Sequence, residues 1–176
     1  MSLRKSLVAV VLTGVVSASA ASAATQLEYR AGLSGEQETA NVATITKGSV
    51  RIVFDTRLTQ FAVLLTVRDG VQITAAHIHC AEAGQNGPII TTLFAGPTQD
   101  VDGTLVNETF DNSDVSTQSC GPDAFEINNV ASLLAALRKE RLYINVHSVA
   151  NPPGEIRGQL FDGGADALLG LVNCAR

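Results

Sequence analysis

Short runs in which apolar and polar residues alternate recur along the chain, and each run is bounded by Gly, Asp, Asn or Pro. Successive side chains of a strand point to opposite faces of a sheet, so this alternation predicts strands with one buried face. Turn-forming residues lie between the runs, as in Asp69-Gly70 and Asn151-Pro152-Pro153-Gly154. The predicted strands cover residues 26–33, 49–54, 61–68, 73–79, 88–94, 142–147 and 155–161.

One segment has a helical period instead. Asn128-Asn129 can cap a helix, Arg138-Lys139 suits its C-terminal end, and apolar residues recur between them at positions 130, 133, 134 and 137. Residues 95–124 have the least regular pattern and predict a long, partly ordered connection, while residues 166–172 could form a short terminal helix or a frayed tail. We therefore expect an all-β fold, an antiparallel β-sandwich or barrel of about seven to eight strands with one short helix.

The first 23 residues have the features of a secretory signal peptide. Arg4 and Lys5 give a positive start, residues 7–16 form an apolar stretch, and Ala21-Ser22-Ala23 is a small-residue cleavage site. The apolar stretch is shorter than the roughly 20 residues that a membrane-spanning helix needs, and no later segment is long and apolar enough. We expect export to the periplasm or the exterior, with residues 24–176 as a single domain and no membrane span.

Composition narrows the possible partners. Of the 176 residues, 45% are hydrophobic and 16% charged, which suits one domain with a buried core. Twelve basic residues stand against 17 acidic ones, a formal charge of −5, whereas nucleic-acid binding needs a clustered basic surface. With no Trp and two Tyr, an aromatic platform for bases is also poorly supplied. We expect no nucleic-acid partner, and the sequence identifies no protein partner.

The three cysteines are Cys80, Cys120 and Cys174. An exported protein lies in an oxidising environment, which favours one disulfide and leaves one cysteine over. Cys80 and Cys120 both lie beside turn-forming residues, so we predict a disulfide between them, with Cys174 free or paired to another chain. Pairings that include Cys174 stay open as alternatives.

All three histidines lie in predicted strands. His77 and His79 are separated by one residue and share a face, while Ile78 points to the opposite, core face. In the strand over residues 142–147, alternation places His147 on the outward face together with Asn145. If the two strands are neighbours, the three imidazoles converge on one side of a sheet.

Three imidazoles with an open position form a minimal site for a metal ion. Outside the cytoplasm and without thiolates at the site, copper is our first candidate and zinc our second. The alternative is that His77, His79 and His147 are structural and bond only to backbone or carboxylate groups.

Polar residues near the end of the chain could support such a site. Glu155 and Arg157 share one face of a predicted strand, and Glu155 could orient a histidine. We expect Glu155, Arg157 and Asn145 to contact the metal ligands and not the ion. The alternative for Arg157 is a cross-strand ion pair with Glu36 or Glu38.

Motifs for catalysis are missing: the sequence has no nucleophile elbow, phosphate-binding loop, dinucleotide-binding motif or EF-hand loop. We therefore predict no catalytic residue. An enzyme activity is conceivable only through a bound metal, as a metal-dependent oxidoreductase.

Two long motifs and a shorter opening one stand out along the chain. The opening motif is Leu33-Ser34-Gly35-Glu36-Gln37-Glu38, the second is His77-Ile78-His79-Cys80 with Gly84 and Asn86-Gly87-Pro88, and the third is Tyr143-Ile144-Asn145-Val146-His147-Ser148 with Asn151-Pro152-Pro153-Gly154-Glu155-Ile156-Arg157-Gly158-Gln159-Leu160. Together they resemble the CHRD family, named after repeats in chordin, with many small secreted bacterial members. The resemblance implies a single all-β extracellular domain and assigns no function. Two hypotheses follow: an exported protein that binds one copper or zinc ion for metal handling or redox protection, or a non-enzymatic adhesion or interaction module.

Overall fold

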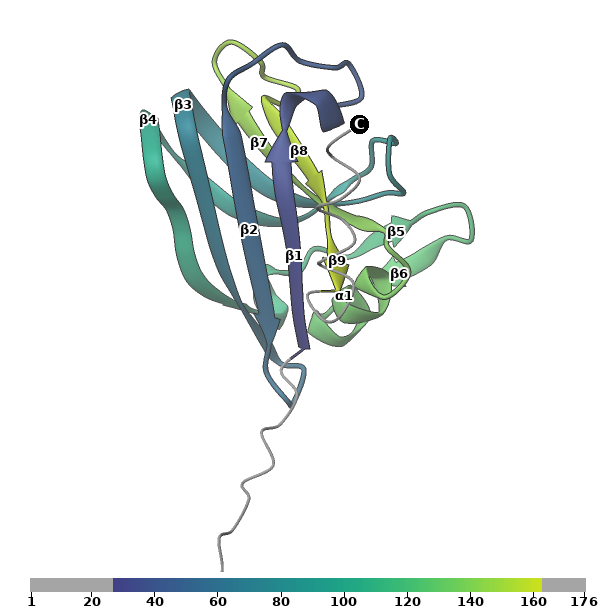
Figure 1. Ribbon diagram of the computed structural model, residues 1–176. Helices are drawn as coiled ribbons and strands as arrows, with labels where there is room; N and C mark the ends of the chain where they lie inside the picture. Colours follow the sequence, from purple (N-terminus) through teal and green to yellow (C-terminus); the bar gives the residue numbers. More distant parts are fainter. Residues whose placement is uncertain (1–26, 163–176) are drawn as a thin grey trace, which may run out of the picture.

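The computed structural model describes residues 27–162 and consists mainly of strands (Figure 1). Besides the strands it has one α-helix and two 3-10 turns. In chain order the elements are β1 (Leu27–Ser34), η1 (Gly35–Gln37), β2 (Lys47–Phe54), β3 (Gln60–Cys80), β4 (Ile89–Asp111), η2 (Asn112–Asp114), β5 (Gln118–Cys120), β6 (Phe125–Ile127), α1 (Val130–Leu137), β7 (Leu142–Ser148), β8 (Ile156–Gln159) and β9 (Phe161–Asp162).

The main sheet closes on itself because of one long strand. Its strands follow the order β2-β1-β8-β7-β3-β4, and every pairing is antiparallel. The first half of β3 pairs with β2 and the second half pairs with β7, which joins the two ends of the sheet. The predicted all-β class is confirmed, and of the two architectures the barrel-like one is observed.

The predicted turn at Asp69-Gly70 is wrong, because the two strands predicted on either side of it are one strand, β3. Asp69 (φ 53°) and Gln72 (φ 49°) are in the left-handed region, and the register with β4 shifts on both sides of Gly70. Such bulges bend a strand without reversing it. The bend lets β3 leave β2 and reach β7 while β4 still pairs along both halves.

The long connection expected over residues 95–124 is also wrong. β4 continues to Asp111, and η2, β5 and a turn fill the rest. Apart from Val101, residues 95–104 are exposed on both faces. A strand without a buried face has no apolar alternation, and here the hydrogen-bond ladder with β3 holds it in place.

The predicted helix is confirmed as α1, with Asn129 as its N-cap accepting a hydrogen bond from Ser132 N at 2.8 Å. It lies with β5 and β6 on one side of the barrel (Figure 1). The predicted pair Cys80 and Cys120 is at disulfide distance, with Cα atoms 5.6 Å apart, and ties the end of β3 to β5. Both cysteines are buried.

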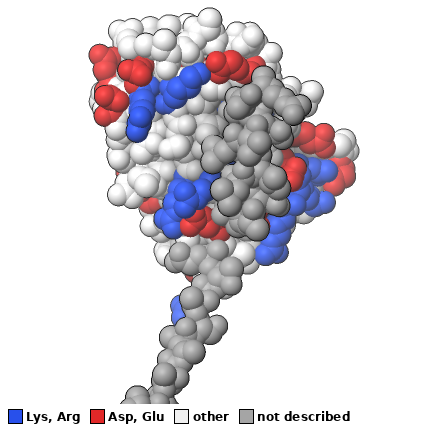
Figure 2. All heavy atoms as spheres, viewed as in Figure 1, with Lys and Arg blue, Asp and Glu red and all other residues white. Residues whose placement is uncertain are grey.

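Several predictions lie outside the described residues: the signal peptide, Cys174 and the terminal segment 166–172. Within residues 27–162, none of the helices combines the length and apolar character needed to cross a membrane. On the face drawn in Figure 2, basic side chains lie beside acidic ones and form no continuous basic surface.

Candidate metal centre

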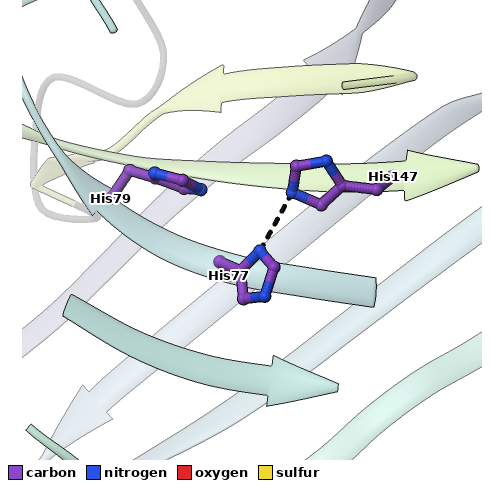
Figure 3. Close-up of side chains that lie close together, drawn as sticks. All are labelled: His77, His79 and His147. Carbon is purple, nitrogen blue, oxygen red and sulfur yellow. Dashed lines mark hydrogen bonds between the residues drawn. The ribbon is translucent and has the colours of Figure 1, made fainter. Parts of the chain in front are cut away.

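The register between β3 and β7 brings the three histidines together. His77 lies opposite Asn145 and His147 lies opposite Ala75, so the two histidines are diagonal neighbours on one face. Between His77 and His79, Ile78 is fully buried on the core face. The predicted convergence of three imidazoles from two neighbouring strands is confirmed (Figure 3).

The three rings are close enough to share one ion. Each contributes one nitrogen to a group whose members all lie within 4.8 Å of one another. The ring centroids are 4.9 Å apart for His77 and His147, 5.5 Å for His77 and His79, and 6.2 Å for His79 and His147. His77 Nδ1 and His147 Nε2 are 2.9 Å apart, the contact dashed in Figure 3.

Two backbone carbonyls determine which ring nitrogens are free. His79 Nδ1 lies 3.0 Å from Gly87 O, and His147 Nδ1 lies 2.9 Å from Pro152 O. A carbonyl oxygen only accepts, so both Nδ1 atoms carry the hydrogen and both Nε2 atoms keep a lone pair. His147 Nε2 then accepts from Nδ1–H of His77, whereas His79 Nε2 is buried without a hydrogen-bond partner among the described residues.

Burial keeps all three rings uncharged. It lowers the pKa of His77 to about 4, helped by repulsion from His147 and His79. Burial also lowers the pKa of His79 and of His147, outweighing the carbonyl bonds that act in the opposite direction. Neutral imidazole is the form that binds metal ions, so near pH 7 no ring has to lose a net proton before an ion can bind.

The CHRD domain model matches residues 29–160, which is most of the chain and includes every residue of the three-histidine group. The chain belongs to the CHRD domain family. No curated protein and no solved structure matches it.

Three segments without regular structure cover this face of the CHRD domain: residues 38–46, 81–88 and 149–155. We call them the covering loops. The first is bonded to the face through Glu38, which accepts from Asn145 at 2.6 Å. The second and third supply the carbonyls of Gly87 and Pro152. The covering loops bury polar side chains of β7 and β8 that alternation alone places outside the barrel.

Glu155 binds the covering loops and not a histidine. Its carboxylate accepts from Thr44 Oγ1 at 2.5 Å, from Ser148 Oγ at 2.7 Å and from Asn151 Nδ2 at 2.5 Å. Burial alone would raise the pKa of Glu155. The hydrogen bonds that it accepts together have a larger effect in the opposite direction, so the pKa lies below its ordinary value. The carbonyls of Gly87 and Pro152 orient the rings of His79 and His147, the role that we had expected of Glu155.

Asn145 lies opposite His77 in the register, but its side-chain amide donates a hydrogen bond to Glu38 and not to a histidine. Burial raises the pKa of Glu38 to about 7, so this carboxyl is only partly charged at neutral pH. The alternative for Arg157, an ion pair with Glu36 or Glu38, is not formed: Glu36 pairs with Lys47 at 3.0 Å, and no described carboxylate lies within ion-pair distance of Arg157.

Arg157 is instead buried, with 2% of its surface exposed. Its guanidinium carbon lies 3.4 Å from the centroid of the Tyr143 ring. Tyr143 in turn stacks on His79, with centroids 5.0 Å apart and planes at 9°. Alternation places Tyr143 on the same outward face as Asn145 and His147, but no pattern indicated that its ring would lie between His79 and Arg157. The turn motifs Asn86-Gly87-Pro88 and Asn151-Pro152-Pro153-Gly154 were the only indication of Gly87 and Pro152.

Proposed function

We propose that this CHRD domain binds a single metal ion, copper in first place and zinc in second, through His77, His79 and His147. The observation that carries the proposal is His79 Nε2, which is buried without a hydrogen-bond partner among the described residues, on a ring that belongs to the three-histidine group. A buried polar atom without a partner costs free energy, and coordination of an ion would use its lone pair.

The ligand atoms follow from the hydrogen bonds. His79 and His147 would bind through Nε2, because their Nδ1 atoms are committed to carbonyls. His77 faces the group with Nδ1, so its hydrogen would move to Nε2 when the ion replaces the bond to His147. Three neutral imidazoles without a thiolate suit Cu(II) or Zn(II) and leave a further position open.

The setting favours a role outside the cytoplasm. The N-terminal sequence has the features of a signal peptide, and a buried cysteine pair at disulfide distance suits an oxidising compartment. In the periplasm or the exterior, such a domain would serve metal handling or protection against redox damage.

Metal titration tests the proposal. Protein purified without chelators or an affinity tag is titrated with Cu(II) and with Zn(II), and compared with the variant in which all three histidines are changed to Ala. We expect one equivalent to bind to the wild type and none of comparable affinity to the variant. Glu28→Gln, which alters a carboxylate paired with Arg51 on the surface, serves as the control and should bind like the wild type. Equal weak binding by wild type and triple variant would refute the proposal.

A second function, an interaction module with structural histidines, is favoured by the bond between His77 and His147, which satisfies two ring nitrogens without an ion. It predicts that wild-type protein unfolds at the same temperature with and without Cu(II) or Zn(II), and that His77→Ala lowers this temperature. Stabilisation by a stoichiometric amount of either ion would decide against it.

A further inference from the structure

Arg157 is buried and has no ion-pair partner among the described carboxylates. Removing a guanidinium from water is costly, and buried arginines normally pair with carboxylates. Here the donors go to the covering loop 81–88: to Gln85 O at 2.7 Å, to Asn86 Oδ1 at 3.2 Å and to Glu82 O at 3.5 Å. The buried charge therefore holds a loop.

That loop carries the carbonyl that orients His79. Gly87 O accepts from His79 Nδ1, and Gly87 N donates to the hydroxyl of Tyr143 at 3.2 Å. Gly87 also packs tightly, because a Cβ atom there would lie 1.8 Å from Cys80 O. The loop has no helix or strand of its own, so the bonds from Arg157 to the residues just before Gly87 help to place this carbonyl.

Arg157 reaches His79 by a second route, through an aromatic ring. β7 lies between β3 and β8 in the sheet, so Tyr143 on β7 stands between His79 on β3 and Arg157 on β8. The guanidinium lies against the Tyr143 ring, and the Tyr143 ring lies nearly parallel to the His79 ring. A planar, permanently charged group suits this stacking.

We propose that Arg157 is a positioning residue for the metal centre: it fixes the plane of the His79 ring through Tyr143, and the hydrogen of His79 Nδ1 through the loop that carries Gly87. The part of this inference that concerns the ion rests on the proposed function. Within residues 27–162, Arg157 forms no hydrogen bond to a histidine of the group, and it acts through two intermediaries, the Tyr143 ring and the loop 81–88.

The test compares three variants by two measurements. Arg157→Met keeps an unbranched, apolar stem but removes the donors and the stacking plane, while Arg157→Lys keeps the charge and part of the donors. Gln159→Met is the matched control, because Gln159 is a buried polar residue of the same strand that donates to Glu140 O, outside the loop, and to Ala81 O, the first residue of the loop and six positions before Gly87. The measurements are the ¹⁵N NMR shifts of the His79 ring in metal-free protein and the affinity for Cu(II) and Zn(II).

In wild-type protein the shifts should show one tautomer, with the hydrogen on Nδ1. In Arg157→Met we expect a mixture of tautomers and an affinity about 10- to 100-fold lower, the usual loss for groups that orient metal ligands. Arg157→Lys should recover part of both. Gln159→Met should lose stability but keep the wild-type shifts and affinity.

A folded Arg157→Met with wild-type shifts and affinity would overturn the inference, and so would the same changes in Gln159→Met. If Arg157→Met does not fold, unchanged shifts and affinity in Arg157→Lys overturn it. The NMR measurement needs no ion, so it separates this inference from the proposed function. Should the wild type bind neither ion, the proposed function fails, while the tautomer of His79 still decides whether Arg157 positions the ring.

Discussion

The two halves of β3 share an apolar inner face and differ in what lies over the outer face. In residues 60–67, buried side chains alternate with more exposed ones, and Leu64 is 38% exposed. In residues 73–80, Ile78 is fully buried on the inner face, while the outer face carries His77 and His79 beside the covering loops. The same strand thus forms an ordinary barrel wall in one half and a candidate site in the other. The difference lies in the covering loops. They bury the histidine rings, which lowers the pKa of those rings, and they supply the carbonyls of Gly87 and Pro152.

The largest effect on stability is expected in the first half. Phe61 is 1% exposed and packs between Phe54 and Phe110, with ring centroids 5.8 and 5.5 Å away. Phe61→Ala should lower the free energy of unfolding by about 3–5 kcal/mol, because it leaves a cavity in the core. Urea denaturation measures the loss. Folded Phe61→Ala should still bind metal like the wild type, and a selective loss of binding would contradict the separation of the two halves.

Lowering the pH should reduce the stability of the protein through His77, on the second half of β3. The pKa of His77 falls from 6.5 to about 4 on folding, so between these pH values the unfolded chain binds more protons than the folded one. The contribution of His77 to the free energy of unfolding is therefore fully present above pH 6.5. It declines as the pH falls towards 4, by at most about 3 kcal/mol. Urea denaturation at several pH values measures the decline. His77→Gln should flatten it, and an equally steep decline in that variant would assign the proton uptake to other groups.

A smaller loss is expected where the cover meets the sheet. Asn145 is 3% exposed and donates to Glu38, a carboxyl whose pKa burial raises to about 7. Asn145→Ala leaves that carboxyl without its donor and should cost about 1–3 kcal/mol. Thermal unfolding at pH 8, where Glu38 is mostly charged, should show the full loss. The loss should shrink at pH 6, and a loss independent of pH would show that the bond to Glu38 is not its cause.

The smallest effect is expected on the uncovered outer face. Leu64 lies on the first half of β3, where the wall faces solvent. Leu64→Ser should change the free energy of unfolding by less than about 0.5 kcal/mol, the usual range for surface positions. Chemical denaturation side by side with Asn145→Ala gives the contrast. Equal losses in the two variants would remove the distinction between a covered and an open outer face.

Alternation along the strands was sufficient to predict the all-β class, the inner face and the outward direction of His77, His79 and His147, because these depend on the two-residue period of a strand. The convergence of the three rings also required that β3 and β7 be neighbours, which the sequence left as a condition. Alternation could not predict that β3 continues through Asp69-Gly70, because a bulge and a turn use the same residue types. Nor could it predict that Arg157 is buried. That burial depends on a loop seventy or so residues earlier in the chain, bonded through Gln85 O and Asn86 Oδ1.

The signal for the carbonyls of Gly87 and Pro152 was weaker still. Every residue carries a carbonyl, so no pattern of side chains indicates which one will face a ring. Glu155 was a candidate neighbour of the metal ligands because it is a carboxylate. Its hydrogen bonds with Thr44, Ser148 and Asn151 show that it instead connects two of the covering loops to β7.

His147 is 70 residues further along the chain than His77, and β4, the disulfide partner Cys120 and α1 all come between them. A nascent chain that ends before β7 has the His-X-His pair but lacks the third ring, so the proposed coordination has to wait until β7 has paired with β3. Binding of the ion would then occur only in protein whose barrel is complete. A truncated or wrongly closed product would bind no ion in the same titration.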